Sequence, residues 1–301
     1  MGTTPAGLRI FAEWSPPTDR RDPVEILIAQ DRHRIPELVP VRYARMRADP
    51  FAFLRGAAAV MAADLGAMPA TDLRLQACGD CHLANFGAFA SPEGTPLFDV
   101  NDFDETLPAP FEWDVKRLAT SLVLAGRVAT KSGRECRRLA RIAARSYRRH
   151  IARLAALSPL ASWSSRIDLA KAIAAIEPGH LRRRLEKRLA VTLARASRHF
   201  GLVEQHQGGW RIREKPPLVY HFGHHELHAR KAFASYAETL DEDRRVLLAR
   251  YHLQDVAFKV VGIGSVGTFC AIGLFVSAAG APLLLQIKEA RESVLAPYAG
   301  P

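Results

Sequence analysis

Carboxylate and amide side chains are concentrated between residues 80 and 104 of this sequence. Asp80 and His82 lie in the run Cys78-Gly79-Asp80-Cys81-His82, Asn85 follows it, and Asp102 comes further along. Phosphoryl transfer needs one carboxylate to deprotonate the acceptor hydroxyl, and an amide and a second carboxylate to hold magnesium against the phosphates. These residue types predict a site in which Asp80 is the catalytic base and Asn85 and Asp102 bind Mg²⁺. We expect His82 to orient the loop rather than to react.

The spacing of these residues matches the arrangement in protein kinases, where the catalytic Asp and the metal-binding Asn are five residues apart and a β-hairpin precedes the metal-binding Asp. Asp80 and Asn85 have this spacing, and a hairpin is predicted over residues 88–100, with its turn at Ser91–Thr95. The pattern Gly-Asp-x-His-x-x-Asn resembles the catalytic loop of the aminoglycoside phosphotransferase and choline kinase branch. Asp114, in Glu112-Trp113-Asp114-Val115, resembles the aspartate that begins the following helix in that branch.

A glycine-rich run near the other end of the chain is the second signal. Gly262, Gly264 and Gly267 form a G-x-G-x-x-G pattern that, if it opened a helix, would indicate a dinucleotide site. Strand-like residues follow instead, and a further strand ends in Lys288. Strand, glycine loop, strand, turn and a strand with a lysine is the kinase arrangement, in which the glycines approach the phosphates and the lysine pairs with them. The pattern therefore predicts an ATP site at Gly262, Gly264, Ser265, Gly267 and Lys288.

The order of the two signals is reversed, because kinases carry the glycine loop before the catalytic loop. Together with Phe51-Ala-Phe-Leu-Arg55-Gly56, Asn101-Asp-Phe-Asp-Glu-Thr106 and Val261-Gly-Ile-Gly-Ser-Val-Gly-Thr268, this order resembles a bacterial family known as domain of unknown function 2252. The resemblance runs from about residue 35 to the end. It implies a kinase-like phosphotransferase fold in circularly permuted order.

The resemblance also indicates a departure from the family, whose members continue beyond the Lys288 segment. A kinase small lobe needs a helix with a glutamate partner for the lysine, and further strands. Few residues follow Lys288, so we expect a C-terminally truncated member. A nucleotide-binding pseudo-enzyme or an inactive fragment is therefore the alternative to an active phosphotransferase.

Two local patterns allow other interpretations. Cys78-Gly79-Asp80-Cys81-His82 satisfies the C-x-x-C-H motif for haem attachment and also offers a redox cysteine pair. His221, His224, His225 and His228 include an i, i+4 pair that could bind a metal. Since no signal peptide, additional cysteine pair or H-E-x-x-H pattern accompanies them, we favour a chance overlap for the first and a histidine-rich helix start for the second.

Most of the positive charge lies in one segment. The chain has 301 residues and a formal net charge of +11, and residues 127–198 carry 19 basic and four acidic residues. Leu139, Ile142, Ile151 and Leu154 recur at helical spacing between the arginines, which predicts amphipathic helices with an arginine-covered outer face. A nucleic-acid-binding helical protein is the second alternative, although no aromatic stacking platform interleaves with these arginines.

The sequence as a whole predicts an α+β protein with a mostly helical large lobe first and a partial, β-rich small lobe last. The expected parts are an N-terminal arm (1–35), a large lobe with the catalytic-loop hairpin (36–253) and a small lobe with the glycine loop and lysine (254–301). The partners expected are ATP, Mg²⁺ and a small-molecule acceptor. The uncharged stretch between Lys259 and Lys288 contains five glycines, so it predicts strands rather than a membrane span. With four cysteines and no signal peptide, a cytoplasmic protein without a membrane partner is expected.

Overall fold

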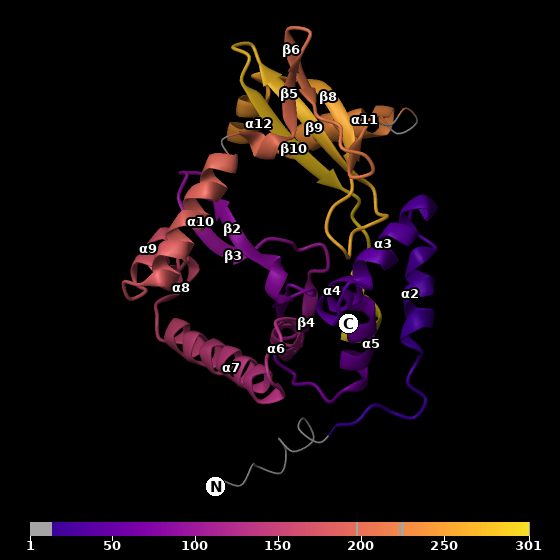
Figure 1. The fold of residues 1–301 in the computed structure, drawn as a ribbon, viewed down its shortest axis with the longest axis vertical. Coiled ribbons are helices and arrows are strands. Elements are labelled where there is room, and N and C mark those ends of the chain that lie inside the picture. The colour runs from indigo at the N-terminus through magenta and orange to yellow at the C-terminus, as the bar shows by residue number, and fades with distance from the viewer. Residues whose placement is uncertain (1–13, 197, 222, 224–225, 301) are drawn as a thin grey trace. The chain divides into compact units, whose positions relative to one another are not determined.

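The computed structural model describes residues 14–196, 198–221, 223 and 226–300 (Figure 1). The chain forms two compact units. Unit 1 comprises residues 1–175 together with 290–301, and unit 2 comprises residues 176–289. The boundaries of these units differ from the boundaries of the expected lobes. Residues 176–253 belong to the same unit as the last strands, and residues 290–301 belong to unit 1.

Unit 1 begins with short helices, namely α2 (Pro23–Asp31), η1 (Pro36–Leu38), α3 (Val39–Met46), α4 (Pro50–Gly56) and α5 (Ala58–Ala67). Asp49 caps α4 by accepting a hydrogen bond from the amide of Ala52 at 2.7 Å. The alanine-rich run from Pro50 to Leu65 is typical of one helix, but the structure divides it at Ala57 into α4 and α5. Residues 1–13 of the expected arm lie outside the described residues. Helix α2 buries Ile26 and Leu27, so this part of the expected arm packs on the body of unit 1.

Two antiparallel strand pairs follow in unit 1. Strand β1 (Arg74–Ala77) pairs with β4 (Leu107–Pro110), and β2 (Phe86–Ala90) pairs with β3 (Pro96–Val100). The short helix η2 (Leu83–Asn85) leads into β2. The β2–β3 pair confirms the predicted hairpin, which the amide of Ser91 closes by donating to the carbonyl of Thr95 at 2.9 Å.

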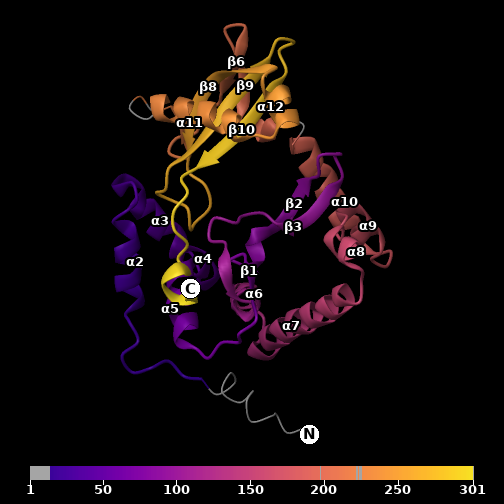
Figure 2. The same ribbon diagram turned by 180° about the vertical axis from the view of Figure 1, so that it is seen from behind.

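The remaining helices of unit 1 are α6 (Glu112–Val128), α7 (Gly133–Ala155), α8 (Pro159–Trp163), α9 (Leu169–Ala174) and α13 (Ala296–Ala299) (Figure 2). One buried cluster joins α5, β1, β4, α6 and α13. Its members are Ala62, Leu65, Ala77, Ala109, Trp113, Leu295 and Ala299. This core fixes β1 and the start of α6, the two elements on either side of the Asp80 loop.

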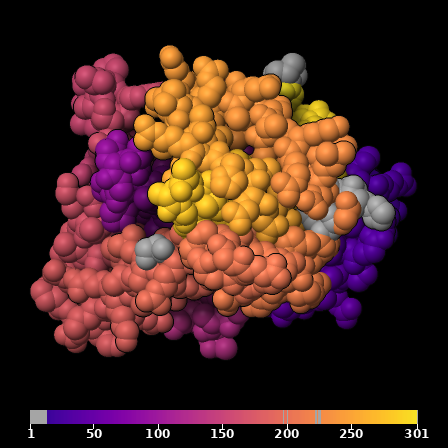
Figure 3. Space-filling view, turned by 90° about the horizontal axis from the view of Figure 1, so that it is seen from above, coloured from indigo at the N-terminus to yellow at the C-terminus, as the bar shows by residue number. Residues whose placement is uncertain are grey.

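Unit 2 is built on a four-stranded antiparallel sheet in the order β10-β9-β8-β7, formed by β7 (Val219–Tyr220), β8 (Tyr251–Lys259), β9 (Cys270–Ser277) and β10 (Pro282–Lys288). Its other elements are α10 (His180–Ala196), η3 (His199–Gly201), the hairpin β5 (Val203–His206) and β6 (Gly209–Ile212), α11 (Glu226–Thr239) and α12 (Glu242–Leu248). Phe233 of α11 packs on the sheet at Gly273, where a Cβ atom would lie 2.7 Å from the ring. The side chains of this unit, orange to yellow, form a closely packed mass (Figure 3).

Helices and antiparallel strands in both units make the protein α+β, as predicted. The stretch from Lys259 to Lys288 forms β9 and β10 and the turns around them, as expected. Within the described residues, no helix combines the length and the apolar character needed to cross a membrane.

Candidate functional site

The loop from Cys78 to His82 is held by the first turn of α6. The Asp114 carboxylate accepts hydrogen bonds from the amides of Cys78 at 2.7 Å and Gly79 at 3.1 Å. Burial raises the pKa of the Asp114 carboxyl, and the two amide hydrogen bonds act in the opposite direction. Asp114 therefore fixes the main chain just before Asp80, and the sequence pattern that singled it out corresponds to a real structural role.

Gly79 allows this loop to turn sharply. Its φ is +82°, and a Cβ atom there would overlap the carbonyl oxygen of Glu105 and lie 2.7 Å from the carbonyl carbon. Glu105 is itself anchored, because its carboxylate accepts a hydrogen bond from the amide of Val294 at 2.7 Å and its carbonyl accepts one from the hydroxyl of Ser293 at 2.8 Å. Only glycine combines this backbone conformation with so close an approach.

The Asp80 carboxylate is paired with a buried arginine. Oδ1 of Asp80 accepts from Nε of Arg117 at 2.6 Å and also pairs with Nη2 of Arg117. Arg117 is 2% exposed and donates from Nη2 to the carbonyl of Leu54 at 2.9 Å. The guanidinium therefore holds one carboxylate oxygen, and the other, Oδ2, lies 3.7 Å from Nε2 of His82.

His82 is a buried, neutral side chain next to Asp80. Burial, together with the positive charges of Arg117 and Arg55, lowers its pKa, and the charge of Asp80 only partly opposes this. Its ring packs edge-on against Phe51 with centroids 6.3 Å apart. The imidazole lies between Phe51 and Asp80.

Asn85 joins the Asp80 loop to the Asp102 segment. Its Nδ2 donates to the carbonyls of Asp80 at 3.1 Å and Asp102 at 3.0 Å, and its Oδ1 accepts from the amide of Asp102 at 2.9 Å. Asn85 is 5% exposed. One buried amide group thus bridges the main chains of the two predicted acidic residues. Asp102 is half-buried, and its Oδ1 accepts from the amide of Asp104 at 3.2 Å.

The two cysteines of this loop are buried free thiols. Cys78 donates to the carbonyl of Asp102 at 3.6 Å. The hydrogen bond with Cys78 and burial raise the pKa of Cys81, so it stays protonated and is a poor nucleophile. Both side chains act as packing groups of the loop. Across the described parts of the chain, no group of three or more His, Cys, Asp or Glu side chains is arranged to hold a metal ion.

The predicted glycine loop connects β8 with β9 in unit 2. Gly262 and Gly267 have positive φ values of +61° and +90°. The loop is closed by Thr268, whose amide and hydroxyl both donate to the carbonyl of Ser265, at 3.2 and 2.8 Å. Strand, glycine turn and strand agree with the expected secondary structure, and a helix after the loop, which a dinucleotide site would need, is absent from this described stretch.

Lys288 ends the next strand of the same sheet. It lies opposite Cys270 in the register of β10 and β9, and Cys270 is the first residue of β9 after the glycine loop. Lys288 therefore lies at the end of the sheet where this loop turns. The structure brings Asp80, His82, Asn85 and Asp102 together within unit 1, and it brings Gly262, Gly264, Ser265, Gly267 and Lys288 to one end of the sheet in unit 2.

The structure describes only part of the histidine cluster, because His224 and His225 lie outside the described residues. His221 is held between two carboxylates, with Nδ1 2.6 Å from Glu214 and Nε2 3.0 Å from Asp255. Burial opposes its protonation, but the hydrogen bonds with Glu214 and Asp255 outweigh this effect and raise the pKa of His221. When protonated, His221 can donate from both ring nitrogens and then links the residue after β7 to Asp255 in β8.

We predict that the hydrogen bonds of His221 with Glu214 and Asp255 stabilise the fold less as the pH rises. The pKa of His221 in the folded protein lies above its value of about 6.5 in the unfolded chain. The stabilisation that His221 gives to the fold is therefore complete below the unfolded pKa, and it is lost as the pH rises through the folded pKa. The difference in the free energy of unfolding between wild type and His221→Gln should therefore be largest near pH 6 and shrink toward alkaline pH, as chemical denaturation would measure. Glu214→Gln should reduce the pH-dependent part. A difference that grows with pH would contradict the prediction.

Arg117 is the residue of this site that the sequence analysis did not identify. Val115 and Leu118 recur at helical spacing but are only half-buried in α6, whereas Trp113, Arg117 and Ser121 are buried. The sequence spacing could have identified Arg117, because it follows Asp114 by three residues and therefore lies on the same face of the helix. Ser121 completes this face by accepting from the amide of Leu83 at 2.9 Å.

Comparison with known proteins gives one match. No curated protein and no solved structure matches the chain. Residues 34–301 match the family described as "uncharacterized protein conserved in bacteria (DUF2252)", nearly the range over which the sequence resembles it. On this match across most of its length, the chain belongs to the DUF2252 family of bacterial proteins.

Proposed function

We propose that the protein is an ATP- and Mg²⁺-dependent phosphotransferase with a kinase-like fold in permuted order, acting on a hydroxyl group of a small molecule. The observation that carries the proposal is the Asn85 side chain, which bonds to the main chains of both Asp80 and Asp102 across an intervening hairpin. Kinases place a catalytic Asp, a metal-binding Asn and a metal-binding Asp in this order around a hairpin.

Asp80 is the proton acceptor in this proposal. Arg117 holds Oδ1 of Asp80 and leaves Oδ2 as the oxygen that takes the proton from the attacking hydroxyl. Asp114 fixes the preceding amides, and the neutral His82 packs beside the carboxylate. Each of these contacts restricts the conformation of the Asp80 side chain, so the base is preorganised before the acceptor hydroxyl binds.

The donor atoms near the loop fit magnesium. Mg²⁺ prefers oxygen ligands, keeps several waters and is usually bound through one or two protein side chains together with substrate phosphates. Asp102 supplies a carboxylate, and Asn85 supplies an amide oxygen with a second lone pair beyond the one that accepts the Asp102 amide. When bound, the ion would neutralise charge on the transferred phosphoryl group. Asn85 and Asp102 are the residues that would hold it.

The nucleotide phosphates would lie against the glycine loop of unit 2. The amides of residues 262–267 line a tight turn, and Lys288 lies at the same end of the sheet. Exposed amides and an ammonium group are the donors that phosphates need. Gly262, Gly264, Ser265, Gly267 and Lys288 are therefore the proposed ATP-binding residues.

We predict that Lys288→Met weakens binding of Mg·ATP by about 10- to 100-fold, because one hydrogen bond to a charged group contributes about 1.5–3 kcal/mol. The matched control is Lys187→Met, which removes an exposed lysine of α10, outside the sheet that carries the glycine loop, and should leave the affinity within twofold. Calorimetric titration measures both. Equal losses in the two variants, or none in either, would contradict the assignment of Lys288.

The alternative is a protein that binds nucleotide without turning it over. The ion pair between Arg117 and Asp80 favours it, since one oxygen of the proposed base is already engaged by a buried cation. Mg·ATP would then raise the midpoint of thermal unfolding while no ADP accumulates. Release of ADP that depends on Mg²⁺ and on an added hydroxyl acceptor distinguishes the phosphotransferase.

A further inference from the structure

Residues 136–167 of unit 1 form a segment of a single charge sign, which we call the Arg-rich segment. It contains most of α7 and all of α8, and it has no Asp or Glu. Its arginines are Arg137, Arg138, Arg141, Arg145, Arg148, Arg149, Arg153 and Arg166. Ordinary protein surfaces intersperse both signs. Eight arginines without a carboxylate therefore indicate a surface suited to an anionic partner.

The acidic residues on either side of the segment are already engaged in local structure. Glu135 forms a capping box with Ser132 at the start of α7. Asp168 caps α9 by accepting from the amide of Lys171 at 3.0 Å. Neither carboxylate forms a salt bridge with an arginine of the Arg-rich segment. Glu93, in the turn between β2 and β3, acts electrostatically on Arg166, so the unbalanced charge is that of the arginines on α7.

Large apolar side chains of the same segment are exposed. Trp163 is 89% exposed and Leu160 is 75% exposed, and the two are three residues apart on α8, so they share one face. Ile142, Ile151, Leu157 and Ile167 are each about half exposed. The sequence pattern predicted that Ile142 and Ile151 would mark a buried helix face, whereas the buried residue of α7 is Cys136.

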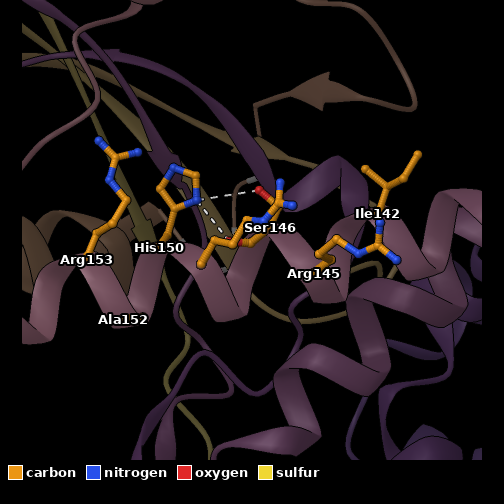
Figure 4. A pocket seen from close by; sticks show the side chains of 7 residues that line it. Ile142, Arg145, Ser146, His150, Ala152 and Arg153 are labelled. Atoms are coloured by element: carbon orange, nitrogen blue, oxygen red, sulfur yellow. Dashed lines mark hydrogen bonds between the residues drawn. The ribbon is translucent and has the colours of Figure 1, made fainter. Parts of the chain in front are cut away.

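The outer face of α7 combines both kinds of side chain. Arg145, Arg149 and Arg153 extend from successive turns and line a shallow hollow with Ile142 and His150 (Figure 4). His150 is kept close to the helix, because its Nδ1 lies 2.9 Å from the carbonyl of Ser146. The guanidinium groups thus stand beside Ile142 on one face of α7.

We propose that the Arg-rich segment binds the surface of a membrane rich in anionic phospholipids, without crossing it. A helix with arginines on its polar face and large apolar side chains beside them lies in the plane of the headgroups. Trp is favoured at this depth because its ring is apolar and its N–H is polar. The arginines bind lipid phosphates, and Leu160 and Trp163 enter the boundary with the acyl chains.

Nucleic acid fits the surface less well. Single strands stack their bases on exposed aromatic rings, and the segment offers Trp163 alone for this purpose, because Tyr147 is half-buried and stacked on Phe111 with centroids 6.2 Å apart. The exposed Leu and Ile side chains gain nothing from a phosphate backbone. They gain free energy only where apolar surface leaves water, which a bilayer provides.

The exposed end of the segment has a fixed position on unit 1. The amide of Phe98 in β3 donates to the carbonyl of Ile167 at 2.9 Å, and Leu97 forms an antiparallel bridge with Asp168. Trp163 is thus presented by a short helix whose following residues are bonded to a strand. Membrane binding then requires little ordering of the chain.

The test is co-sedimentation of the full chain with vesicles of equal parts phosphatidylglycerol and phosphatidylcholine, compared with phosphatidylcholine alone. We expect binding to the anionic vesicles only, and release at roughly 0.5 M salt. Because each arginine near such a surface contributes about fivefold to the partition coefficient, Arg145→Gln with Arg149→Gln should lower it roughly 30-fold. The matched control, Arg244→Gln with Arg245→Gln on α12, should change it less than threefold.

A second variant tests the apolar contact. Leu160→Ser with Trp163→Ser leaves every charge in place, and both side chains are exposed, so the fold is retained. We expect this variant to bind at least tenfold more weakly and to lose the blue shift of tryptophan fluorescence that vesicles cause. Three results would overturn the proposal, namely equal binding to neutral vesicles, unchanged binding by both double variants, and displacement of the protein from anionic vesicles by a small excess of duplex DNA or single-stranded RNA.

Discussion

Asp80→Asn is expected to lower the rate of Mg·ATP turnover by about 10²- to 10⁴-fold, the usual contribution of a general base. The amide keeps the shape of the side chain and can still accept a hydrogen bond from Arg117, but it cannot take the proton of an attacking hydroxyl. Hydrolysis of Mg·ATP to ADP, with water as the acceptor, measures the effect without knowledge of the natural substrate. The same measurement on Asp102→Asn should show a loss of similar size.

The stability of this variant must be measured beside its activity, because Asp80 neutralises a buried cation. Arg117 is 2% exposed, and removing the partner of a buried ion pair costs about 3–5 kcal/mol. The Asp80 side chain is 22% exposed and asparagine retains one hydrogen bond, so we expect a smaller loss of about 1–3 kcal/mol in the free energy of unfolding. Asp80→Ala, which retains nothing, is the poorer test since unfolding would also abolish turnover.

The chain supplies a matched control in the pair formed by Arg20 and Asp64. Its geometry is similar, with Nε to Oδ1 at 2.6 Å and Nη2 to Oδ2 at 2.8 Å, but both side chains are about one-third exposed. Asp64→Asn should therefore cost less than about 1 kcal/mol and leave turnover unchanged. If a folded Asp80→Asn protein turned over Mg·ATP within threefold of the wild-type rate, Asp80 would not be the base.

Local sequence patterns were sufficient for the β2–β3 hairpin and for the last strands of unit 2, whereas the β5–β6 hairpin and β7 were not predicted. Alternating residues around the turn at Ser91–Thr95 specify β2 and β3, and the turn residues between β8, β9 and β10 divide an apolar stretch into strands of ordinary length. Each of these elements depends on neighbours in the sequence. Periodicity therefore contains most of the information needed to predict them.

Interactions between distant segments were not visible in the same way. Arg117 follows Lys116 in α6, and its burial depends on Asp80 and on the carbonyl of Leu54, 37 and 63 residues away. The roles of Glu105 and Ser293 likewise depend on a contact across 188 residues. A single sequence lists such residues without pairing them, so the supports of the loop emerge only from the three-dimensional structure.

Gly79→Ala is expected to destabilise unit 1 by at least about 3 kcal/mol. A non-glycine residue with positive φ costs about 1–3 kcal/mol, and here a Cβ atom would also overlap the carbonyl of Glu105. The carbonyl cannot move aside easily, because Ser293 donates a hydrogen bond to it and the Glu105 carboxylate is fixed by the amide of Val294. The overlap could be removed only if the Asp80 loop moved away from Glu105, which would break the hydrogen bonds between Asp114 and the amides of Cys78 and Gly79.

Gly94 separates the two contributions to this loss. It has nearly the same φ, +80°, but nothing lies within 4 Å of a Cβ atom built on it. Gly94→Ala should therefore cost only the conformational part, about 1 kcal/mol, whereas Gly79→Ala should lose that amount and the cost of the overlap as well. Chemical denaturation of both variants measures the difference. Equal losses would mean that the Asp80 loop can shift away from Glu105, and the rigid positioning of the proposed base by Asp114 and Asn85 would then have to be abandoned.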